Sequence, residues 1–372
     1  MLAIPPAPAS VVSASFGFPR IFRGAITLSP SSAPPAPFAW GFMAWVIQQK
    51  HGIHLPQIGW SLDATRRAER SFVSHAHSDH MARHPEVVCT YATARLMRAR
   101  LPSKKRTEHI LPFGHTEQLT PDCTVTLHPA GHIFGSAQIL LNHAEHGSLL
   151  YTGDFKLYPG HAAEACATPR ADTLIMETTF GLPRYVFPPA DEIIANLIAF
   201  CRQALADGAT PVLFCYSLGK SQEVLRALAP AGLPVMLHAE TFRLTRICAR
   251  LGLDFPPHAE FTASTHAGHV IITPAHAPGL LKHVTTPRTA AITGWALDRS
   301  VNHRFQSTAA FPLSDHADFP SLLAFVDRVQ PKRVYTVHGF TKEFAATLRA
   351  RGIEASPLGE GYQPELPLAG AV

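Results

Sequence analysis

A short polar segment that directly follows the apolar run 71–73 holds side chains able to bind a metal ion. It reads Ser74-His75-Ala76-His77-Ser78-Asp79-His80. Successive strand residues point to opposite faces, so His75 and His77 share a side. His77, Asp79 and His80 can surround a second point only if the chain turns there. Nitrogen and oxygen ligands of this kind suit zinc, and two adjacent ligand groups suit two metal ions about 3.5–4 Å apart.

Three further ligand-type residues stand at the ends of other expected strands. His132 follows the strand expected at 123–128, Asp154 follows an apolar run that ends at Tyr151, and His338 closes the segment 334–339. Each has a glycine beside it, which lets the backbone approach closely. His128 competes with His132 for the role of ligand, and we expect it to point back along its strand. The complete set of candidate ligands for a dinuclear centre is His75, His77, Asp79, His80, His132, Asp154 and His338.

Composition limits the class of protein that can carry this site. The chain has 372 residues, a formal net charge of +5 and 46% hydrophobic residues, which suits two globular units and excludes a wholly disordered chain. It has no run of about 18 apolar residues, so we expect neither a transmembrane helix nor a membrane partner. The six scattered cysteines form no CxxC pair, which argues against a disulfide scaffold or a thiolate zinc site. They favour a reducing compartment, and we expect a cytoplasmic protein.

Short apolar runs bounded by glycine, proline and polar residues predict the elements that position these side chains. Strands are expected at 70–74, 87–91, 123–128, 137–142, 148–152, 172–177, 211–215, 234–238, 269–273, 289–293, 309–313 and 333–337. Helices are expected at 92–101, 190–206, 219–229, 240–251, 319–329 and 341–351. The early strands read mostly as hairpins, whereas the later ones alternate with helices as in βαβ units. Domain boundaries are therefore expected near residues 185 and 305.

The two ends of the chain differ from the rest. Residues 1–42 contain eight prolines and no acidic residue, since the first carboxylate of the chain is Asp63. Arg20, Arg23 and the abundant serines faintly resemble an organelle transit peptide. We favour a disordered extension, or translated sequence upstream of a true start near Met43. Residues 356–372 are rich in proline, glycine and leucine and are expected to be a tail.

The order of the candidate ligands resembles that of the metallo-β-lactamase fold. The shared pattern is H-x-H-x-D-H, followed by His132, Asp154 and a late His338. The resemblance implies an α/β protein built as an αββα sandwich, with the metals at one edge between two sheets. It matches Asp63 to an aspartate that orients a ligand histidine by a hydrogen bond. It also implies two Zn²⁺ ions, with Mn²⁺ as the alternative, one held by His75, His77 and His132, the other by Asp79, His80 and His338, with Asp154 bridging.

Three later segments narrow this resemblance to nucleic-acid-processing members that carry a β-CASP domain. They are IMETTFG at 175–181, SDHADF at 314–319 and VHG at 337–339. The resemblance implies a metallo-β-lactamase domain over residues 44–185 and 305–355, with an inserted α/β β-CASP domain over residues 186–304. HPAGHIFGSAQ, ETTFGLPRY and YSLGKSQEVL are most similar to segments of bacterial DNA-ligase-associated exonuclease-like proteins. A histidine at position 338 is instead typical of RNA-directed relatives.

Phosphodiester hydrolysis is the chemistry that such a site supports. A hydroxide held between two zinc ions is a strong nucleophile at neutral pH, and the metals offset the charge that develops on the phosphate. The leaving oxygen needs a proton, for which His316 is the candidate general acid. We expect Glu177 to hold His316 charged and oriented, and Asp79 and Asp63 complete the candidate catalytic set. Asp318 is expected to cap the helix at 319–329.

Weaker signals point to contacts with the substrate. Ser217, Gly219 and Lys220 open an expected helix, and a helix N-terminus of this composition can bind a backbone phosphate although the segment is not a P-loop. Arg98 belongs to the basic stretch 95–106. This stretch either contacts phosphate outside the cleft or forms a solvated face.

The leading hypothesis is a zinc-dependent phosphodiesterase, more specifically a DNA exonuclease that acts on ends in repair. The first alternative is a β-CASP ribonuclease that acts on RNA. A small-molecule thioester or lactone hydrolase would share the zinc ligands but has no reason to carry Glu177, His316 and an inserted domain. A degenerate scaffold subunit would lack ligands, and none is missing. The expected partners are nucleic acid, DNA before RNA, and a DNA ligase or a repair helicase.

Overall fold

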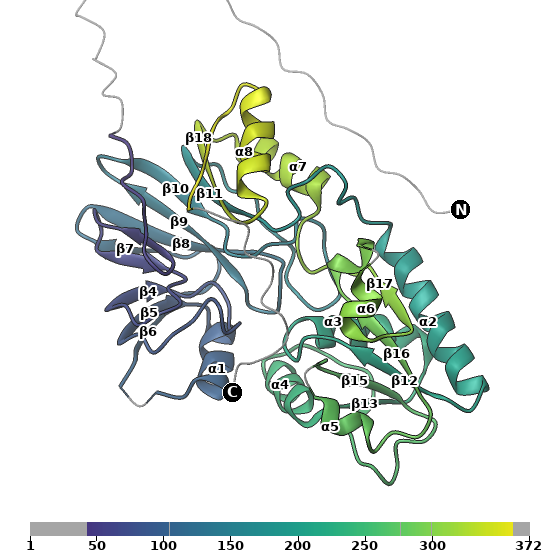
Figure 1. Cartoon of the computed structure of the whole chain (residues 1–372). Coiled ribbons are helices and arrows are strands. Elements are labelled where there is room, and N and C mark those ends of the chain that lie inside the picture. The colour runs from purple at the N-terminus through teal and green to yellow at the C-terminus, as the bar shows by residue number, and fades with distance from the viewer. Residues whose placement is uncertain (1–42, 104, 276, 299, 360–372) are drawn as a thin grey trace, which may run out of the picture. The chain divides into compact units, whose positions relative to one another are not determined.

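The computed structural model describes residues 43–359, except for Lys104, His276 and Arg299. The expectations for residues 1–42 and for residues 360–372 of the tail lie outside this part of the chain. The described residues form three β-sheets, and helices pack against each of them (Figure 1).

The first sheet has the strand order β1-β2-β3-β4-β5-β6. Its strands are β1 (Gln48–Gln49), β2 (Ile53–Leu55), β3 (Trp60–Leu62), β4 (Arg70–Phe72), β5 (Glu86–Cys89) and β6 (Thr107–Ile110). Helix α1 (Tyr91–Arg100) connects β5 to β6, and the Thr90 side chain caps it by accepting a hydrogen bond from the Thr93 amide. The pairs from β1 to β3 are antiparallel, but those from β3 to β6 are parallel. The expectation of early hairpins is therefore wrong for β3 to β6, because parallel neighbours need a crossover connection.

The second sheet has the order β19-β18-β11-β10-β9-β8-β7. Its strands are β7 (Thr116–Thr120), β8 (Cys123–Pro129), β9 (Ala137–His143), β10 (Gly147–Tyr151), β11 (Thr173–Thr178), β18 (Arg333–Gly339) and β19 (Glu354–Pro357). The pairs from β7 to β10 are antiparallel, as expected, and those from β10 to β19 are parallel. Ser356 and Pro357 pair with β18, so the sheet extends past the point where the sequence predicts a tail.

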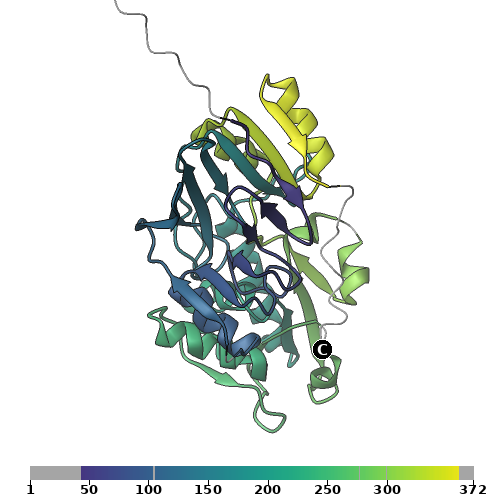
Figure 2. The ribbon, with the colours of Figure 1, turned by 90° about the vertical axis from the view of Figure 1, so that its left-hand side faces the viewer.

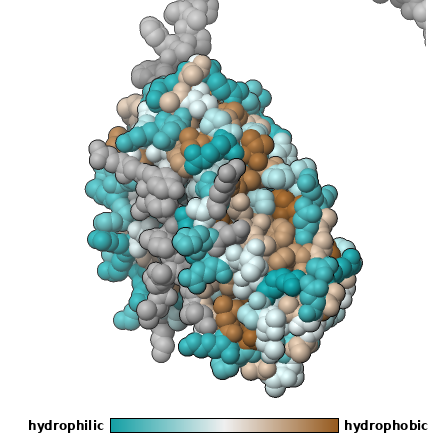
Figure 3. Space-filling model, turned by 45° about the vertical axis from the view of Figure 1, so that its right-hand side comes forward, coloured by the Kyte–Doolittle hydropathy of each residue, from teal (hydrophilic) through white to brown (hydrophobic). Residues whose placement is uncertain are grey.

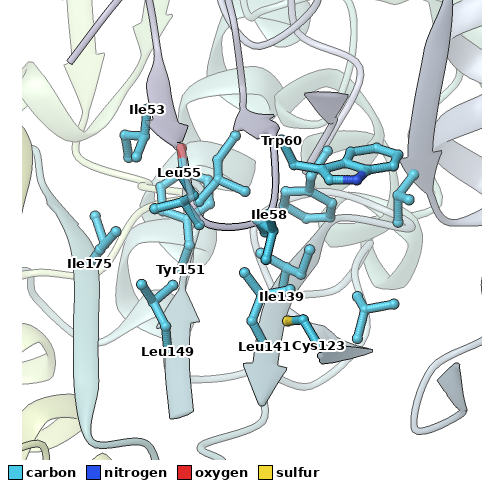
Figure 4. Packing of buried hydrophobic residues seen from close by; sticks show 14 of the residues in the cluster. Ile53, Leu55, Ile58, Trp60, Cys123, Ile139, Leu141, Leu149, Tyr151 and Ile175 are labelled. Carbon is cyan, nitrogen blue, oxygen red and sulfur yellow. The ribbon is translucent and has the colours of Figure 1, made fainter. Parts of the chain in front are cut away.

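Apolar side chains join the first two sheets face to face (Figure 4). Alternation along β9 directs Ile139 and Leu141 into this core, where they join Leu55 and Trp60 of the first sheet. Burial of each such side chain stabilises the fold by about 1.5–3 kcal/mol. Helices α7 (Phe319–Val329) and α8 (Thr341–Ala350) pack against the other face of the second sheet, and α1 packs against the first. The layers are thus helix, sheet, sheet, helix, which confirms the αββα sandwich (Figures 1 and 2).

The third sheet lies in the segment between β11 and α7 and has the order β14-β13-β15-β12-β16-β17. Its strands are β12 (Thr210–Phe214), β13 (Val235–Leu237), β14 (His258–Glu260), β15 (Val270–Thr273), β16 (Pro287–Ile292) and β17 (Ala309–Phe311), and all of its pairs are parallel. The accompanying helices are α2 (Ala190–Ala206), α3 (Lys220–Ala227), α4 (Ala239–Arg250), α5 (Pro278–Leu281) and α6 (Val301–Phe305), with short 3₁₀ turns at Ala229–Ala231 and Gly294–Leu297. This confirms an inserted α/β unit of βαβ type. Its limits at 186 and 304 stay a prediction, and β17 lies beyond the second of them.

The longer elements agree with the sequence prediction better than the short ones do. Helices α2 and α7 have the predicted bounds, whereas β1, β2, β3, β6, β7, β14 and β19 were not predicted. These strands have two to five residues, which is too short to show a period of two against the background of the loops.

Within the described residues, no helix is long and apolar enough to cross a bilayer. On the face seen in Figure 3, hydrophobic residues form small patches among hydrophilic ones. All six cysteines lie in the described part of the chain and carry free thiols.

Asp172 joins the amino-terminal ends of three parallel strands of the second sheet. Its carboxylate accepts hydrogen bonds from the amide and hydroxyl of Ser148 at 3.1 and 2.6 Å and lies 2.7 Å from Nζ of Lys332. Burial acts to raise its pKa, but Lys332 and Ser148 outweigh burial and lower the pKa of Asp172 to about 2.

We expect Asp172→Asn to lower the free energy of unfolding by about 1 kcal/mol at neutral pH, because two donors and a cation lose their charged acceptor. Since the folded-state pKa is depressed, this difference is complete above about pH 5 and shrinks as the pH falls toward about 2. Urea denaturation of both proteins at several pH values measures it. A difference that stays constant down to about pH 3 would contradict the assigned pKa.

Candidate metal centre

The candidate ligands lie where several strands end. Four of them, His75, His77, Asp79 and His80, follow β4. His132 follows β8, Asp154 follows β10, and His338 lies near the end of β18. Strands β8, β10, β11 and β18 run in the same direction, so their carboxyl ends meet at one edge of the second sheet. Gly153, with φ of 55°, lets the chain after β10 approach the loop after β4, because a Cβ atom there would lie 2.6 Å from Cβ of Ser74.

Three imidazoles converge on one point. Nδ1 of His77 lies 3.0 Å from Nε2 of His75 and 3.3 Å from Nε2 of His132. Burial and, to a smaller extent, neighbouring imidazoles lower the pKa of His75 and of His132. Burial and the His132 imidazole together lower the pKa of His77 to about 4. The three rings are therefore neutral at pH 7, which is the form that binds metal.

The outward nitrogens of two of these rings face backbone carbonyl groups. Nε2 of His77 lies 3.0 Å from the Leu218 oxygen, and Nδ1 of His132 lies 2.9 Å from the Asp315 oxygen. A carbonyl oxygen only accepts, so the outward nitrogens carry the proton and the inward nitrogens carry lone pairs. Lone pairs that face each other at this distance repel unless a cation lies between them. The donor set of His75, His77 and His132 therefore fits a metal ion such as zinc.

The carboxylate of Asp63 lies next to a second group of candidate ligands and accepts hydrogen bonds from the residues around it. It accepts hydrogen bonds from the amide and hydroxyl of Ser74 at 2.7 and 2.5 Å and from the Tyr151 hydroxyl at 2.9 Å. Its Oδ2 also lies 2.9 Å from Nδ1 of His80, which leaves Nε2 of His80 facing Asp154 at 3.2 Å. This position is compatible with the role proposed for Asp63, the orientation of a ligand histidine.

Asp154 lies between the two groups of imidazoles. Its Oδ2 is 3.2 Å from Nε2 of His80, 3.7 Å from Nε2 of His75 and 3.9 Å from Nε2 of His132. Burial acts to raise the pKa of Asp154, but His80 lowers it well below its usual value, and Asp154 in turn raises the pKa of His80. A carboxylate at this position can contact an ion in either group, as the proposed bridging role requires.

Asp79 and His338 flank these groups on the exposed side. Asp79 has a side chain that is 62% exposed, with Oδ2 at 3.8 Å from Nε2 of His80, and the His338 ring centroid lies 5.6 Å from that of His80. A register shift in the pairing of β11 and β18 sets Thr178 opposite Gly339 and leaves His338 with φ of 57°. Such a bulge re-aims a side chain at the edge of a sheet. Asp79 and His338 thus remain candidate ligands, next to the groups of residues whose ligand atoms lie within 4.8 Å of one another.

Glu177 and His316 form a buried pair next to the imidazoles. Oε1 of Glu177 lies 2.8 Å from Nδ1 of His316 and accepts the Phe155 amide at 2.9 Å, while Oε2 is bound by the amide and hydroxyl of Thr179. Burial acts to lower the pKa of His316, but Glu177 raises it well above its usual value. A ligand atom of His316 also lies within 4.8 Å of those of His132 and Asp154, so His316 reaches the metal groups themselves.

Three residues that were expected to bind substrate, Lys220, Gly219 and Ser217, are buried or half-buried. Lys220 is 1% exposed, and its Nζ lies 2.7 Å from the Leu313 oxygen and 3.0 Å from Oδ1 of Asp315. The ammonium group is therefore buried in an ion pair, and the expected contact of Lys220 with phosphate stays a prediction. Gly219 is buried as well, and Ser217 is half-buried. Ser217 lies in the turn before α3, and Gly219 is the N-cap residue of that helix.

Arg98, Asp318 and His128 lie outside the groups of candidate ligands. Arg98 is exposed on α1 and pairs with Glu108, so contact with phosphate there stays a prediction. Asp318 caps α7 by accepting the Ser321 amide at 3.0 Å, as expected. His128 belongs to none of the ligand groups found among the described residues.

Sequence reasoning missed two backbone groups that orient ligands, the carbonyl oxygens of Leu218 and Asp315. No residue type marks a carbonyl acceptor, so no motif could have identified them. It also missed the ion pair of Lys220 with Asp315, because the two residues lie 95 positions apart by their numbers. The Tyr151 hydroxyl on Asp63 was missed for the same reason.

We expect Asp63→Ala to lower the free energy of unfolding by about 3 kcal/mol, because buried donors of Ser74 and Tyr151 lose their acceptor. Zinc affinity should fall by about 10–100-fold, since His80 loses the group that orients it. Urea denaturation and competition with a zinc chelator measure the two effects. Tyr151→Phe is the control, because it removes one donor and leaves the contact with His80. Unchanged zinc affinity in Asp63→Ala would contradict the orienting role.

Comparison with known proteins is consistent with this architecture. Residues 304–356 match the family model RMMBL, the Zn-dependent metallo-hydrolase RNA specificity domain. A protein of Opitutus terrae named probable DNA ligase is 58% identical over 326 residues, which cover 87% of this chain and 32% of that protein. The 5′ exonuclease Apollo of Rattus norvegicus is 28% identical over 336 residues, which cover 85% of this chain and 57% of Apollo. The transcription termination factor FttA of Pyrococcus abyssi is 36% identical over 122 residues, which cover 32% of this chain and 19% of that factor.

The chain thus spans less than two thirds of the length of each of these relatives. Similarity to the first two extends over most of the chain, across both the sandwich and the parallel sheet inserted in it. The order along the chain of the candidate ligands after β4, β8 and β10 and at the end of β18 supports the same family. The chain belongs to the β-CASP family of metallo-β-lactamase-fold proteins.

Proposed function

We propose that this protein is a zinc-dependent phosphodiesterase that hydrolyses nucleic acid, and that it acts as a DNA exonuclease on ends during repair. The observation that carries the proposal is the buried pair of Glu177 and His316 beside the converging imidazoles. Hydrolysis of a phosphodiester needs a proton for the leaving oxygen as well as a nucleophile, and this pair can supply that proton.

Each part of the site has a separate task in this proposal. Two zinc ions, when bound, would supply a nucleophile at neutral pH and offset the charge of the phosphate. His75, His77 and His132 would hold one of them, and Asp79, His80 and His338 the other, with Asp154 between them. His316 carries its proton at neutral pH because Glu177 raises its pKa. With Nδ1 bound to Glu177, the nitrogen left to donate to the leaving oxygen is Nε2.

The relatives support DNA as the substrate. Apollo is named a 5′ exonuclease, and a protein with 58% identity over most of this chain is named a probable DNA ligase. That protein is about three times as long as the aligned segment, since the segment covers 32% of it. We therefore propose that the nuclease works together with a DNA ligase, with a repair helicase as the alternative partner. Action in the cytoplasm stays a prediction from the cysteines.

Hydrolysis of RNA is the second candidate function, and two observations favour it. Residues 304–356 match a model described as an RNA specificity domain, and a transcription termination factor shares 36% identity over 122 residues. His338, a histidine at the end of β18, is the residue type expected in RNA-directed relatives. No comparable observation favours a thioester or lactone substrate.

Matched DNA and RNA oligonucleotides, labelled at the 5′ or the 3′ end and incubated with zinc-loaded protein, separate the two candidates. We expect DNA to be shortened from one end and RNA to be cleaved at least about tenfold more slowly. Asp79→Ala and His316→Ala should each reduce kcat by about 10²–10⁴-fold, which excludes a contaminating nuclease. Faster cleavage of RNA would support the ribonuclease instead, and no cleavage of either would overturn both.

We expect Glu177→Gln to move the alkaline limb of the pH profile of kcat toward lower pH by about one unit or more. A general acid works only while protonated, so activity falls as the pH rises through its pKa. Glu177 raises the pKa of His316, and its neutral replacement removes that effect. Asp172→Asn, which removes a carboxylate far from His316, should leave the profile in place. An unshifted alkaline limb in Glu177→Gln would remove His316 from the role of general acid.

A further inference from the structure

The turn that precedes α3 lies directly against the candidate metal ligands, although it belongs to the inserted unit. The Leu218 oxygen lies 3.0 Å from Nε2 of His77. Leu218 is buried in one apolar cluster with Ile133. Gly219 has φ of 86° and approaches Ile133 so closely that a Cβ atom there would lie 2.2 Å from Cγ2 of Ile133. Packing on both sides therefore holds the Leu218 carbonyl group against His77.

Lys220 connects the same turn to a second ligand. Its Nζ lies 2.7 Å from the Leu313 oxygen and 3.0 Å from Oδ1 of Asp315. These two residues belong to the loop between β17 and α7. The Asp315 oxygen of that loop lies 2.9 Å from Nδ1 of His132. Lys220 therefore fixes the backbone that orients His132, and the next residue of the loop is His316.

Contact of Lys220 with a phosphate does not fit this arrangement. The side chain is 1% exposed, and a carboxylate and a carbonyl oxygen already accept hydrogen bonds from its ammonium group. To reach a phosphate, Lys220 would have to leave Asp315 buried and without a counter-ion, which is strongly unfavourable. The buried pair instead restricts the geometry of the loop at 313–316.

We propose that residues 218–220 are a positioning element of the metal centre. Leu218 sets the tautomer of His77 through its carbonyl group, and Lys220 sets that of His132 through the loop at 313–315. The inserted unit thereby completes the metal centre, in addition to any contact it makes with substrate. This inference rests on the metal centre of the proposed function.

Zinc affinity, measured on the full chain by competition with a chromogenic chelator, tests the proposal. Lys220→Met keeps most of the side-chain volume, removes the ammonium group, and is expected to weaken zinc binding by about 10–100-fold, the usual effect of losing a group that orients a metal ligand. Gly219→Ala should weaken it as well, because its Cβ atom displaces the turn. On a labelled oligonucleotide, kcat should fall while KM changes less than about twofold. A raised KM with unchanged zinc affinity would indicate a phosphate contact and overturn the proposal.

Lys156→Met is the matched control. Nζ of Lys156 lies 3.6 Å from Oε1 of Glu223, a residue of the same helix α3, and the Lys156 side chain is 15% exposed. The substitution removes a mostly buried ammonium group, 15% exposed against 1% for Lys220, whose ion-pair partner lies in α3 and not in the loop at 313–315. Its zinc affinity is expected to stay within about twofold of the wild-type value, against the 10–100-fold loss in Lys220→Met. An equal loss in both variants would overturn a specific role for Lys220.

A double variant separates positioning from folding. Lys220→Met leaves the Asp315 carboxylate unpaired, which by itself can unfold the protein. Lys220→Met combined with Asp315→Asn removes both charges but keeps the Asp315 carbonyl group, so the fold should recover while zinc binding stays weak. A folded double variant with wild-type zinc affinity would overturn the proposal. Wild-type protein that binds no zinc would overturn the metal centre and this inference together. Weakened zinc binding in variants of a protein without nuclease activity would support the inference and overturn only the proposed function.

Discussion

Convergence of three imidazole lone pairs on one point is the constraint on which the rest of the site depends. The inward nitrogens of His75, His77 and His132 lie about as close as hydrogen-bonded atoms, yet acceptors on the outward side of two of the rings make the inward nitrogens acceptors too. Such an arrangement is stable only with a cation between the rings. The protein must therefore hold the three rings in place against this repulsion.

Rigidity comes from three separate parts of the fold. The sandwich aligns the carboxyl ends of β8, β10, β11 and β18, which sets the positions of His132, Asp154 and Glu177. Asp63 holds the loop after β4 through the amide and hydroxyl of Ser74. The inserted unit supplies the remaining contact, the carbonyl group of Leu218 on His77.

Charge is distributed in the site so that every buried ion has a partner. Asp154 pairs with His80, Glu177 with His316, and Asp315 with Lys220. Single buried charges are costly, whereas pairs with hydrogen bonds to both members are tolerated and restrict geometry. The three carboxylates thus serve different ends. One faces the metal groups, one keeps a histidine protonated, and one anchors a loop.

Much of the fold could be predicted because the longer strands and helices are marked by apolar runs or by helical spacing of apolar residues. The helices α2 and α7 repeat buried residues at helical spacing over 17 and 11 residues, and the strands from β8 to β12 stand out as largely apolar runs of five to seven residues. Strands β1 to β3 are too short for such a signal, and their pairing depends on what the second sheet presents to them. The parallel direction of β3 to β6 likewise depends on the crossover connections between these strands, and no local sequence pattern specifies such connections.

The candidate ligands could be named from the sequence alone, because seven ligand-type residues stand near the ends of expected strands with unusual spacing. The role of Lys220 could not be predicted from the sequence. In the sequence it stands at the start of a helix next to glycine and serine, as a phosphate-binding residue would, and only the folded chain brings it within 3.0 Å of Asp315. The same holds for the carbonyl groups of Leu218 and Asp315. Side-chain types determine which residues can bind a metal, but the backbone groups that orient them become neighbours only through tertiary packing, since hydrogen-bond geometry between distant segments has no counterpart in local sequence.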